Sequence, residues 1–353
     1  MTLWFFLACA ASSRAPLPVD TAPAPASILL QGGRVVGQGL VDVWMRDGRI
    51  LEVGEGLAAE GAEVIDVSGR FLVPAFIDSH VHLAYLPEGG AMADGGVAGA
   101  VDLAAPIEFL AIDHAPLEVR AAGPMITASG GYPTRSWGSD GYGLECTSAA
   151  EAVAAVDRLH NAGASVVKLP ITADPQLDDG AISVATARAH ALGMRVASHA
   201  LSDDEASRAA AAGVDALAHT PTSELSSDTL ASWSGRAVIS TLGAFGGRAT
   251  TLANLAALRD AGATVLYGTD FGNSRFAGID PDEILLLQSA GLSGAEILAA
   301  GTSAPAAFWG FEDLGVIAVG RAASLLVLPA DPLVTPESLT VPEQVWIAGE
   351  RRR

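Results

Sequence analysis

Apolar and polar positions follow two different patterns along the chain. Between residues 73 and 315, short apolar runs such as 165–169 and 195–199 are separated by Ala-rich stretches with the spacing of amphipathic helices. Glycines such as Gly163 stand where these helices should end. Strands that alternate with helices of about ten to fifteen residues are typical of parallel βα units, and roughly eight units fit here. The pattern predicts an α/β fold, a (β/α)₈ TIM barrel over residues 73–315.

Both ends of the chain show the second pattern, in which short β-like pieces are separated by Gly-rich or charged turns. Because the C-terminal segment repeats the pattern of short β-like pieces seen in the N-terminal segment, we expect the two ends to pair. They predict a small composite β-sandwich domain formed by residues 27–72 and 316–353. The β-like pieces are 28–30, 40–45, 50–53, 63–67, 315–317, 324–328 and 344–347.

The first 26 residues form a leader, an apolar run over 3–8 followed by Cys9 and a stretch rich in Ala, Ser and Pro. The residues around Cys9 resemble the lipobox of bacterial lipoproteins, which implies a signal peptide and a lipid anchor on Cys9 in the cell envelope or periplasm. No Lys or Arg precedes the apolar run, and the run is short for a signal peptide. The alternatives are a disordered leader or a displaced start codon, and without a working signal the protein would be cytoplasmic.

Composition narrows the class of partner. The chain of 353 residues has a formal net charge of −20, which would repel a phosphate backbone, so nucleic acid is excluded as a partner and a small molecule is expected. Two cysteines cannot make a disulfide framework or a thiolate metal site. Of the 20 basic Lys and Arg residues only Lys168 is a lysine, which makes its position informative.

The candidate chemistry lies at the ends of predicted strands. His80 and His82 follow an apolar run at positions i and i+2, so period-two alternation places both imidazoles on one side. Neutral histidine is a common metal ligand. The ends of four further predicted strands carry metal-competent side chains, and in barrel enzymes these ends face the active site. These side chains are Lys168, His199, His219 and Asp270.

With these residues the chain resembles the amidohydrolase superfamily, in its imidazolonepropionase and prolidase-like branch. The resemblance implies two divalent metal ions, with zinc expected, one bound by His80, His82 and Asp270. His199 and His219 would bind the other, and a carbon dioxide-derived carbamate on Lys168 would bridge the two. It also implies cleavage of an amide (C–N) bond, in a dipeptide or another small amide, by a metal-bridging hydroxide, with Asp270 as general base and acid.

Several alternatives remain open. The same metal centre would serve a lactone or ester hydrolase, a mononuclear site would suit a deaminase, and a barrel that lost turnover would be an envelope binding protein. The loop 130–137 follows the third predicted strand, so Tyr132 and Arg135 are candidates for substrate binding. Homo-oligomers are implied by the resemblance alone. Ala323-Ser324-Leu325 departs from the family's Ala-Asp-Leu, which concerns the sandwich and leaves the site untouched.

Overall fold

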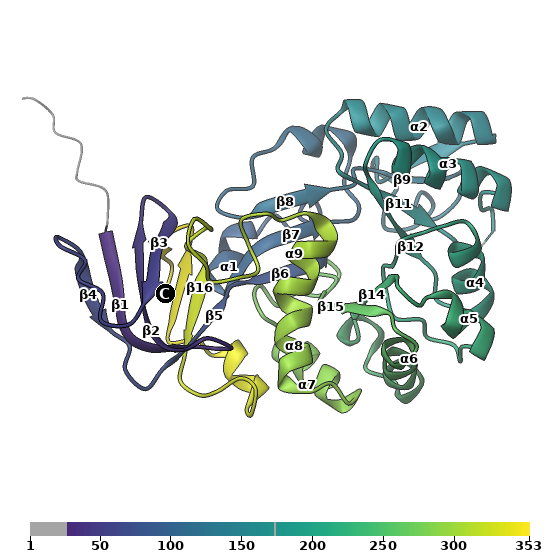
Figure 1. Cartoon of the computed structure of the whole chain (residues 1–353). Helices are drawn as coiled ribbons and strands as arrows, with labels where there is room; N and C mark the ends of the chain where they lie inside the picture. The colour runs from purple at the N-terminus through teal and green to yellow at the C-terminus, as the bar shows by residue number, and fades with distance from the viewer. Residues whose placement is uncertain (1–26, 173) are drawn as a thin grey trace, which may run out of the picture.

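The computed structural model describes residues 27–172 and 174–353 (Figure 1). The predicted leader, with the predicted lipid anchor at Cys9, lies outside the described residues and stays a prediction. Within the described ranges no helix combines the length and the apolar character that crossing a bilayer requires.

Strands from both chain ends share one sheet, on the left of Figure 1. The strand order is β18-β17-β16-β5-β1-β2-β3, and β4 pairs with β1. The sheet therefore joins the two chain ends as expected, but it is one continuous hydrogen-bonded sheet that curls around its own apolar core. Its strands are β1 (Ser27–Val35), β2 (Gly39–Arg46), β3 (Arg49–Gly54), β4 (Glu63–Asp66), β5 (Phe71–Pro74), β16 (Leu325–Leu328), β17 (Gln344–Ile347) and β18 (Glu350–Arg351).

One predicted strand of this domain is wrong. Residues 315–317 form no strand, because Gly315 adopts a positive φ of 82° and packs against the helix before it, where a Cβ would lie 2.5 Å from that of Ala306. Ile317 is still buried, and its carbonyl accepts a hydrogen bond from the Gln38 side chain at 2.9 Å. The segment thus contributes an apolar side chain to the core without forming strand hydrogen bonds.

The central region consists of parallel strands that alternate with helices. Three strands form one sheet in the order β6-β7-β8, and five form another in the order β11-β12-β13-β14-β15, while β9 pairs with β10 and contacts β11. These strands are β6 (Phe76–Val81), β7 (Val97–Asp102), β8 (Glu118–Ala121), β9 (Met125–Ala128), β10 (Gly143–Cys146), β11 (Val166–Pro170), β12 (Arg195–His199), β13 (Ala216–Leu217), β14 (Ala237–Ile239) and β15 (Thr264–Leu266).

The last strand returns to the first. The Ser79 N–H donates to the Tyr267 carbonyl at 2.9 Å, and Val81 forms a parallel bridge with Phe271. At the other junction, the Ser165 N–H donates to the Ala121 carbonyl at 2.9 Å and so links β8 to the start of β11. The fold is therefore mixed α/β, and these links between its parallel sheets are consistent with a TIM-barrel-type domain.

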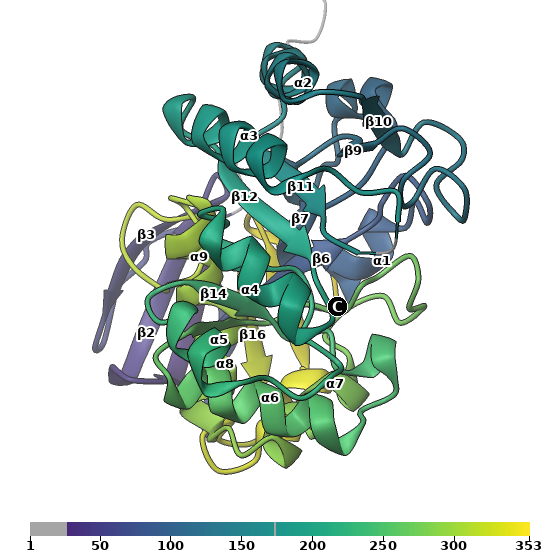
Figure 2. The ribbon, with the colours of Figure 1, turned by 90° about the vertical axis from the view of Figure 1, so that its right-hand side faces the viewer.

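The helices lie outside the strands, and Figure 2 shows α3 to α6 on the outer face. Several begin at a side chain that caps the free N–H groups of the first turn, as Ser202 does in a capping box with Glu205. The helices are α1 (Gly89–Asp94), α2 (Ala149–Asn161), α3 (Asp179–Ala191), α4 (Asp203–Ala211), α5 (Ser227–Ser232), α6 (Ala249–Asp260), α7 (Pro281–Ser289), α8 (Gly294–Gly301) and α9 (Ser303–Trp309).

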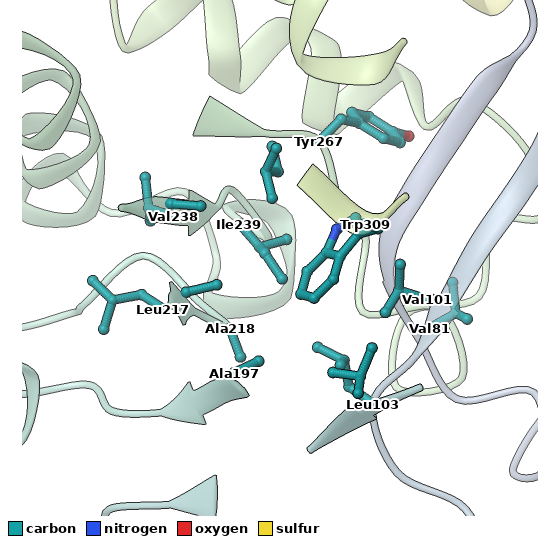
Figure 3. Packing of buried hydrophobic residues seen from close by; sticks show 14 of the residues in the cluster. Val81, Val101, Leu103, Ala197, Leu217, Ala218, Val238, Ile239, Tyr267 and Trp309 are labelled. Atoms are coloured by element: carbon teal, nitrogen blue, oxygen red, sulfur yellow. The ribbon is translucent and has the colours of Figure 1, made fainter. Parts of the chain in front are cut away.

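The interior of the strand series is filled with small aliphatic side chains. Figure 3 shows Trp309 of α9 among residues from opposite strands, including Val101, Leu103 and Ile239. The Trp309 indole N–H donates to the Ser79 hydroxyl at 3.2 Å, so the one polar atom of this large side chain is paired. The packed interior leaves polar residues to gather at the carboxyl ends of the strands.

Close packing between α8 and β6 makes Gly301 a sensitive position. A Cβ at Gly301 would lie 2.2 Å from the ring of Phe76, which is fully buried and cannot move aside. We expect Gly301→Ala to lower the free energy of unfolding by about 1–3 kcal/mol in chemical denaturation. Gly90→Ala is the matched control, since a Cβ there meets open space. Equal stability of the two variants would contradict this packing.

Candidate metal centre

The two histidines of the His-x-His motif lie at the end of β6 with both rings buried. Nδ1 of His80 lies 2.7 Å from the Ala218 carbonyl, and Nδ1 of His82 lies 3.3 Å from the Ala104 carbonyl. A carbonyl oxygen only accepts, so each Nδ1 carries the ring proton. With the proton on Nδ1, the Nε2 atom of each ring faces the site, where a neutral imidazole offers the lone pair that a metal ligand requires.

Asp270 faces both of these Nε2 atoms. Its Oδ1 lies 3.0 Å from Nε2 of His82 and 3.5 Å from Nε2 of His80. One ligand atom from each of the three residues lies within 4.8 Å of the others. Two lone pairs and a carboxylate oxygen repel one another unless a cation or a proton lies between them. The three residues therefore fit a divalent metal ion.

The backbone of Asp270 is held in an uncommon conformation. Its φ of 57° is in the left-handed region, and the Asn273 amide donates to both carboxylate oxygens, at 3.1 and 3.3 Å. Burial opposes ionisation of Asp270, but His80, His82 and Asn273 outweigh it and lower its pKa to about 2. The side chain is therefore a carboxylate at neutral pH.

His199 and His219 lie on the adjoining strands. His199 is the last residue of β12, and His219 follows β13 by two residues. Their ring centroids are 4.8 Å apart, and the ring of His219 lies 4.5 Å from that of His80. Burial, reinforced by Lys168, lowers the pKa of His199 to about 3, and burial lowers the pKa of His219 well below its ordinary value. Both imidazoles are neutral and suited to a metal.

Lys168 is fully buried in β11. Its Nζ has no hydrogen-bond partner among the described residues, and neither has Nε2 of His80. Burial lowers the pKa of Lys168 to about 7, although Asp270 opposes this. An unpartnered amine in this position is costly unless it serves another group. A lowered pKa raises the share of neutral amine at neutral pH, and the neutral amine is the form that reacts with carbon dioxide. The donor set thus fits the predicted carbamate.

Two buried carboxylates that the sequence analysis did not single out support this centre. Asp78 accepts from the backbone N–H groups of His80 and Thr269 and from the Thr269 hydroxyl. Asp102 accepts from the N–H of Leu83, the residue after His82. It also accepts from the N–H of Ala104, whose carbonyl contacts Nδ1 of His82. The sequence offered a clue to Asp78, because this residue precedes His80 by two positions and so shares its side of the strand. Asp102 had none.

Aromatic side chains line the same end of the strands. The ring of Tyr132 lies 4.9 Å from His199, that of Trp137 lies 5.2 Å from His82, and that of Phe245 lies 5.0 Å from His219. The Trp137 indole N–H donates to the Tyr132 hydroxyl at 2.8 Å. These three rings form a wall, called the aromatic wall below, beside the candidate metal ligands. Sequence reasoning identified Tyr132 but missed the other two.

The predicted arginine is placed differently. Arg135 is exposed, and its guanidinium packs over Gly130, where a Cβ would lie 2.2 Å from Nη2. The guanidinium of Arg275 lies 6.0 Å from the centre of the Tyr85 ring, which in turn packs beside Trp137 of the aromatic wall. Arg275 forms no ion pair with any described residue.

A family model, described as the amidohydrolase family, matches residues 139–352. The chain therefore belongs to the amidohydrolase family, a family of hydrolases, and the resemblance seen in the sequence is confirmed.

Known proteins show similarity of two kinds. An uncharacterized protein of Mycobacterium tuberculosis is 28% identical over 355 residues, covering 88% of this chain and 91% of its own length. Dihydroorotase of Trichlorobacter lovleyi is 48% identical over only 63 residues, 16% of this chain, so the chain spans just 15% of that relative. Among solved structures, a Xaa-Pro dipeptidase with methionine in its active site has a TM-score of 0.80 at 18% identity, covering 92% of this chain and 99% of that one.

Burial of Lys168 predicts a stability cost that the variant Lys168→Met should remove. The unfolded side chain keeps its ordinary pKa, whereas the folded one has a pKa of about 7. Each pKa unit corresponds to about 1.4 kcal/mol, so we expect the metal-free variant to be more stable by a few kcal/mol at pH 7. Methionine also fits the space of the lysine stem.

The stability difference between the wild type and Lys168→Met should depend on pH in a defined direction. Between pH 7 and the ordinary pKa of 10.5, the unfolded wild-type chain binds a proton that the folded chain lacks. The wild-type protein should therefore approach the variant in stability as the pH rises through this window, as measured by denaturation at several pH values. A constant difference would show that Lys168 is not held neutral by burial.

Proposed function

We propose that this protein hydrolyses an amide (C–N) bond in a small substrate, with two divalent metal ions, zinc as the expected metal, on a complete (β/α)₈ barrel. One observation carries the proposal. Nε2 of His80, Nε2 of His82 and a carboxylate oxygen of Asp270 converge in a buried site, and together they are a donor set that fits a divalent cation.

The residues divide into two sets that would each hold one metal ion. His80, His82 and Asp270 would hold the first, and His199 and His219 would hold the second. Lys168, as a carbamate, would be shared, because its amine is buried beside both sets. When bound, the two metal ions would acidify a water molecule and polarise the substrate carbonyl.

Asp270 is the residue we assign to proton transfer. Its carboxylate is ionised and oriented by Asn273, so it can accept a proton from the attacking water. It would then deliver that proton to the leaving nitrogen, which cannot depart as an amide anion. The surrounding aromatic wall, with Tyr132 and Trp137, would exclude bulk water and bind the substrate's apolar part.

A substrate with a carboxylate fits the charges at the edge of the wall. The solved Xaa-Pro dipeptidase, similar in fold, has methionine in its active site, and an amino acid carries a carboxylate. Arg275, which forms no ion pair with the described residues, is a cation on a chain with a formal net charge of −20. We therefore propose a dipeptide or an N-acyl amino acid, with Arg275 as the carboxylate partner and Arg135, the earlier candidate, in a lesser role.

A substrate panel tests the reaction class. With zinc and bicarbonate supplied, Xaa-Pro dipeptides and N-acyl amino acids should be hydrolysed, and Asp270→Asn should lower kcat by at least about 100-fold because the proton acceptor is lost. Asp260→Asn, an exposed residue on α6, is the control and should leave kcat unchanged. Turnover of lactones alone, or of amino-substituted bases alone, would replace amide hydrolysis by lactonase or deaminase activity. Inactivity of the fully metal-loaded protein toward every class would favour a binding protein.

The role of Arg275 is tested by removing charge from either partner. Arg275→Met should raise KM for a carboxylate-bearing substrate by about tenfold, the effect of one solvent-exposed charge-assisted contact. For the same substrate with a terminal carboxamide the variant and the wild type should have similar KM values. Arg46→Met, on the curled sheet, is the matched control. A similar rise in KM for both substrates would mean that Arg275 does not bind the carboxylate.

A further inference from the structure

We propose that Thr241, held in place by Glu283 through the loop after β14, is a positioning residue that orients His219 for the second metal ion. The inference rests on the proposed two-metal site but names residues outside it. We call residues 240–247, which include the short helix η2 (Gly243–Phe245), the β14 loop.

Thr241 contacts the ring nitrogen of His219 that does not face the site. Its Oγ1 lies 3.0 Å from Nδ1 of His219, and both side chains are buried. When Nδ1 donates its proton to this oxygen, the Nε2 lone pair of His219 is free for a metal ion and the ring cannot rotate without losing the bond. His80 and His82 use backbone carbonyls for the same purpose, so His219 alone depends on a hydroxyl in the described structure.

The backbone of Thr241 is strained in a way that points to this contact. Its φ is 40°, in the left-handed region that a β-branched residue rarely adopts. The Thr241 N–H donates to the Gly268 carbonyl at 3.1 Å, which holds the residue against the neighbouring strand end. A glycine or asparagine would adopt this conformation more easily, so the hydroxyl is the property that favours threonine here.

Glu283 fixes the loop that carries Thr241. From α7, its two carboxylate oxygens accept the N–H groups of Leu242 and Gly243, at 2.9 and 2.8 Å. The β14 loop contains three glycines, at 243, 246 and 247, and would otherwise have many accessible conformations. One turn further along α7, Leu286 packs against Gly247, where a Cβ would lie 2.5 Å from it. The helix thus holds the loop at both ends.

The same loop places an aromatic ring on His219. Phe245 meets the imidazole edge to face at a centroid distance of 5.0 Å. His219 is therefore held by Thr241 at one ring nitrogen and by Phe245 against its ring. The hydrogen bonds that hold the other site residues His80 and His82 come from outside the β14 loop, namely from Ala218, Ala104 and Asp78. Weakening the β14 loop should consequently affect the second metal ion and spare the first.

The experiment compares Thr241→Val with Thr241→Ser in full-length protein. Valine keeps the branched shape and removes the hydroxyl, whereas serine keeps the hydroxyl. Zinc would be titrated against a chromophoric chelator in the presence of bicarbonate, and bound zinc counted by elemental analysis. We expect Thr241→Val to weaken the second zinc about 10- to 100-fold, the usual effect of losing a partner of a metal-bound histidine. The first zinc should be unaffected, and serine should restore the second to near the wild-type affinity.

Two further variants separate positioning from general stability. Glu283→Gln cannot accept both loop N–H groups, so it should also weaken the second zinc selectively. Thr186→Val is the matched control, because Thr186 is buried in α3 without a hydrogen-bond partner among the described residues, and it should bind zinc like the wild type.

The outcomes are distinguishable. If wild-type protein binds two zinc ions and Thr241→Val binds both with unchanged affinity, the positioning role is wrong and the two-metal site stands. An equal loss of both ions in Thr241→Val also overturns the proposal, because a merely structural role predicts that result. If the wild type binds only one ion, the two-metal function itself fails. Should Thr241→Val not fold, Glu283→Gln decides by the same criteria.

Discussion

The carboxylate of Asp78 is the contact on which the geometry of the site depends most. It accepts the His80 N–H from its own strand end and, across the closure of the strand series, both the N–H and the hydroxyl of Thr269, the latter at 2.6 Å. Burial raises the pKa of Asp78 to about 7, although these three donors favour the charged form. Because Thr269 precedes Asp270, this one side chain places Asp270 opposite the first two histidines.

Around this contact the molecule concentrates polar groups that a packed core normally excludes. The strand interior is filled by small aliphatic residues, and at its mouth lie a lysine, four imidazoles and an aspartate, all of them buried. Keeping Lys168 neutral and Thr241 and Asp270 at positive φ costs stability that the surrounding core must supply. Strain and unpaired polar atoms occur together at the site proposed to be functional, as expected where function and stability compete.

The sequence predicted well what depends on local periodicity. The expected strands over 165–169 and 195–199 appear within a residue of their predicted bounds, and helices occupy Ala-rich stretches beside them, because apolar spacing and caps are local signals. All six metal-competent residues lie together, because each stands in a parallel strand or a few residues after the carboxyl end of one. The barrel boundaries and the metal ligation itself stay predictions.

Contacts between distant segments could not be predicted. Asp78 and Thr269 are 191 residues apart, and Glu283 meets Leu242 across 41, so no spacing in the sequence connects them. The orientation of a loop side chain could not be predicted from the sequence either. Loop packing determines where Arg135 and Arg275 lie relative to the aromatic wall. The expected strand over 315–317 failed because a glycine at positive φ turns the chain there.

The central claim is that these six residues hold two metal ions. The most direct measurement is a crystal structure of the protein grown with zinc and bicarbonate, with anomalous diffraction recorded at the zinc edge. The account predicts two anomalous peaks, one against His80, His82 and Asp270 and one against His199 and His219, with extra density on Nζ of Lys168 between them. A single peak with an unmodified Lys168, or peaks away from these residues, would contradict it.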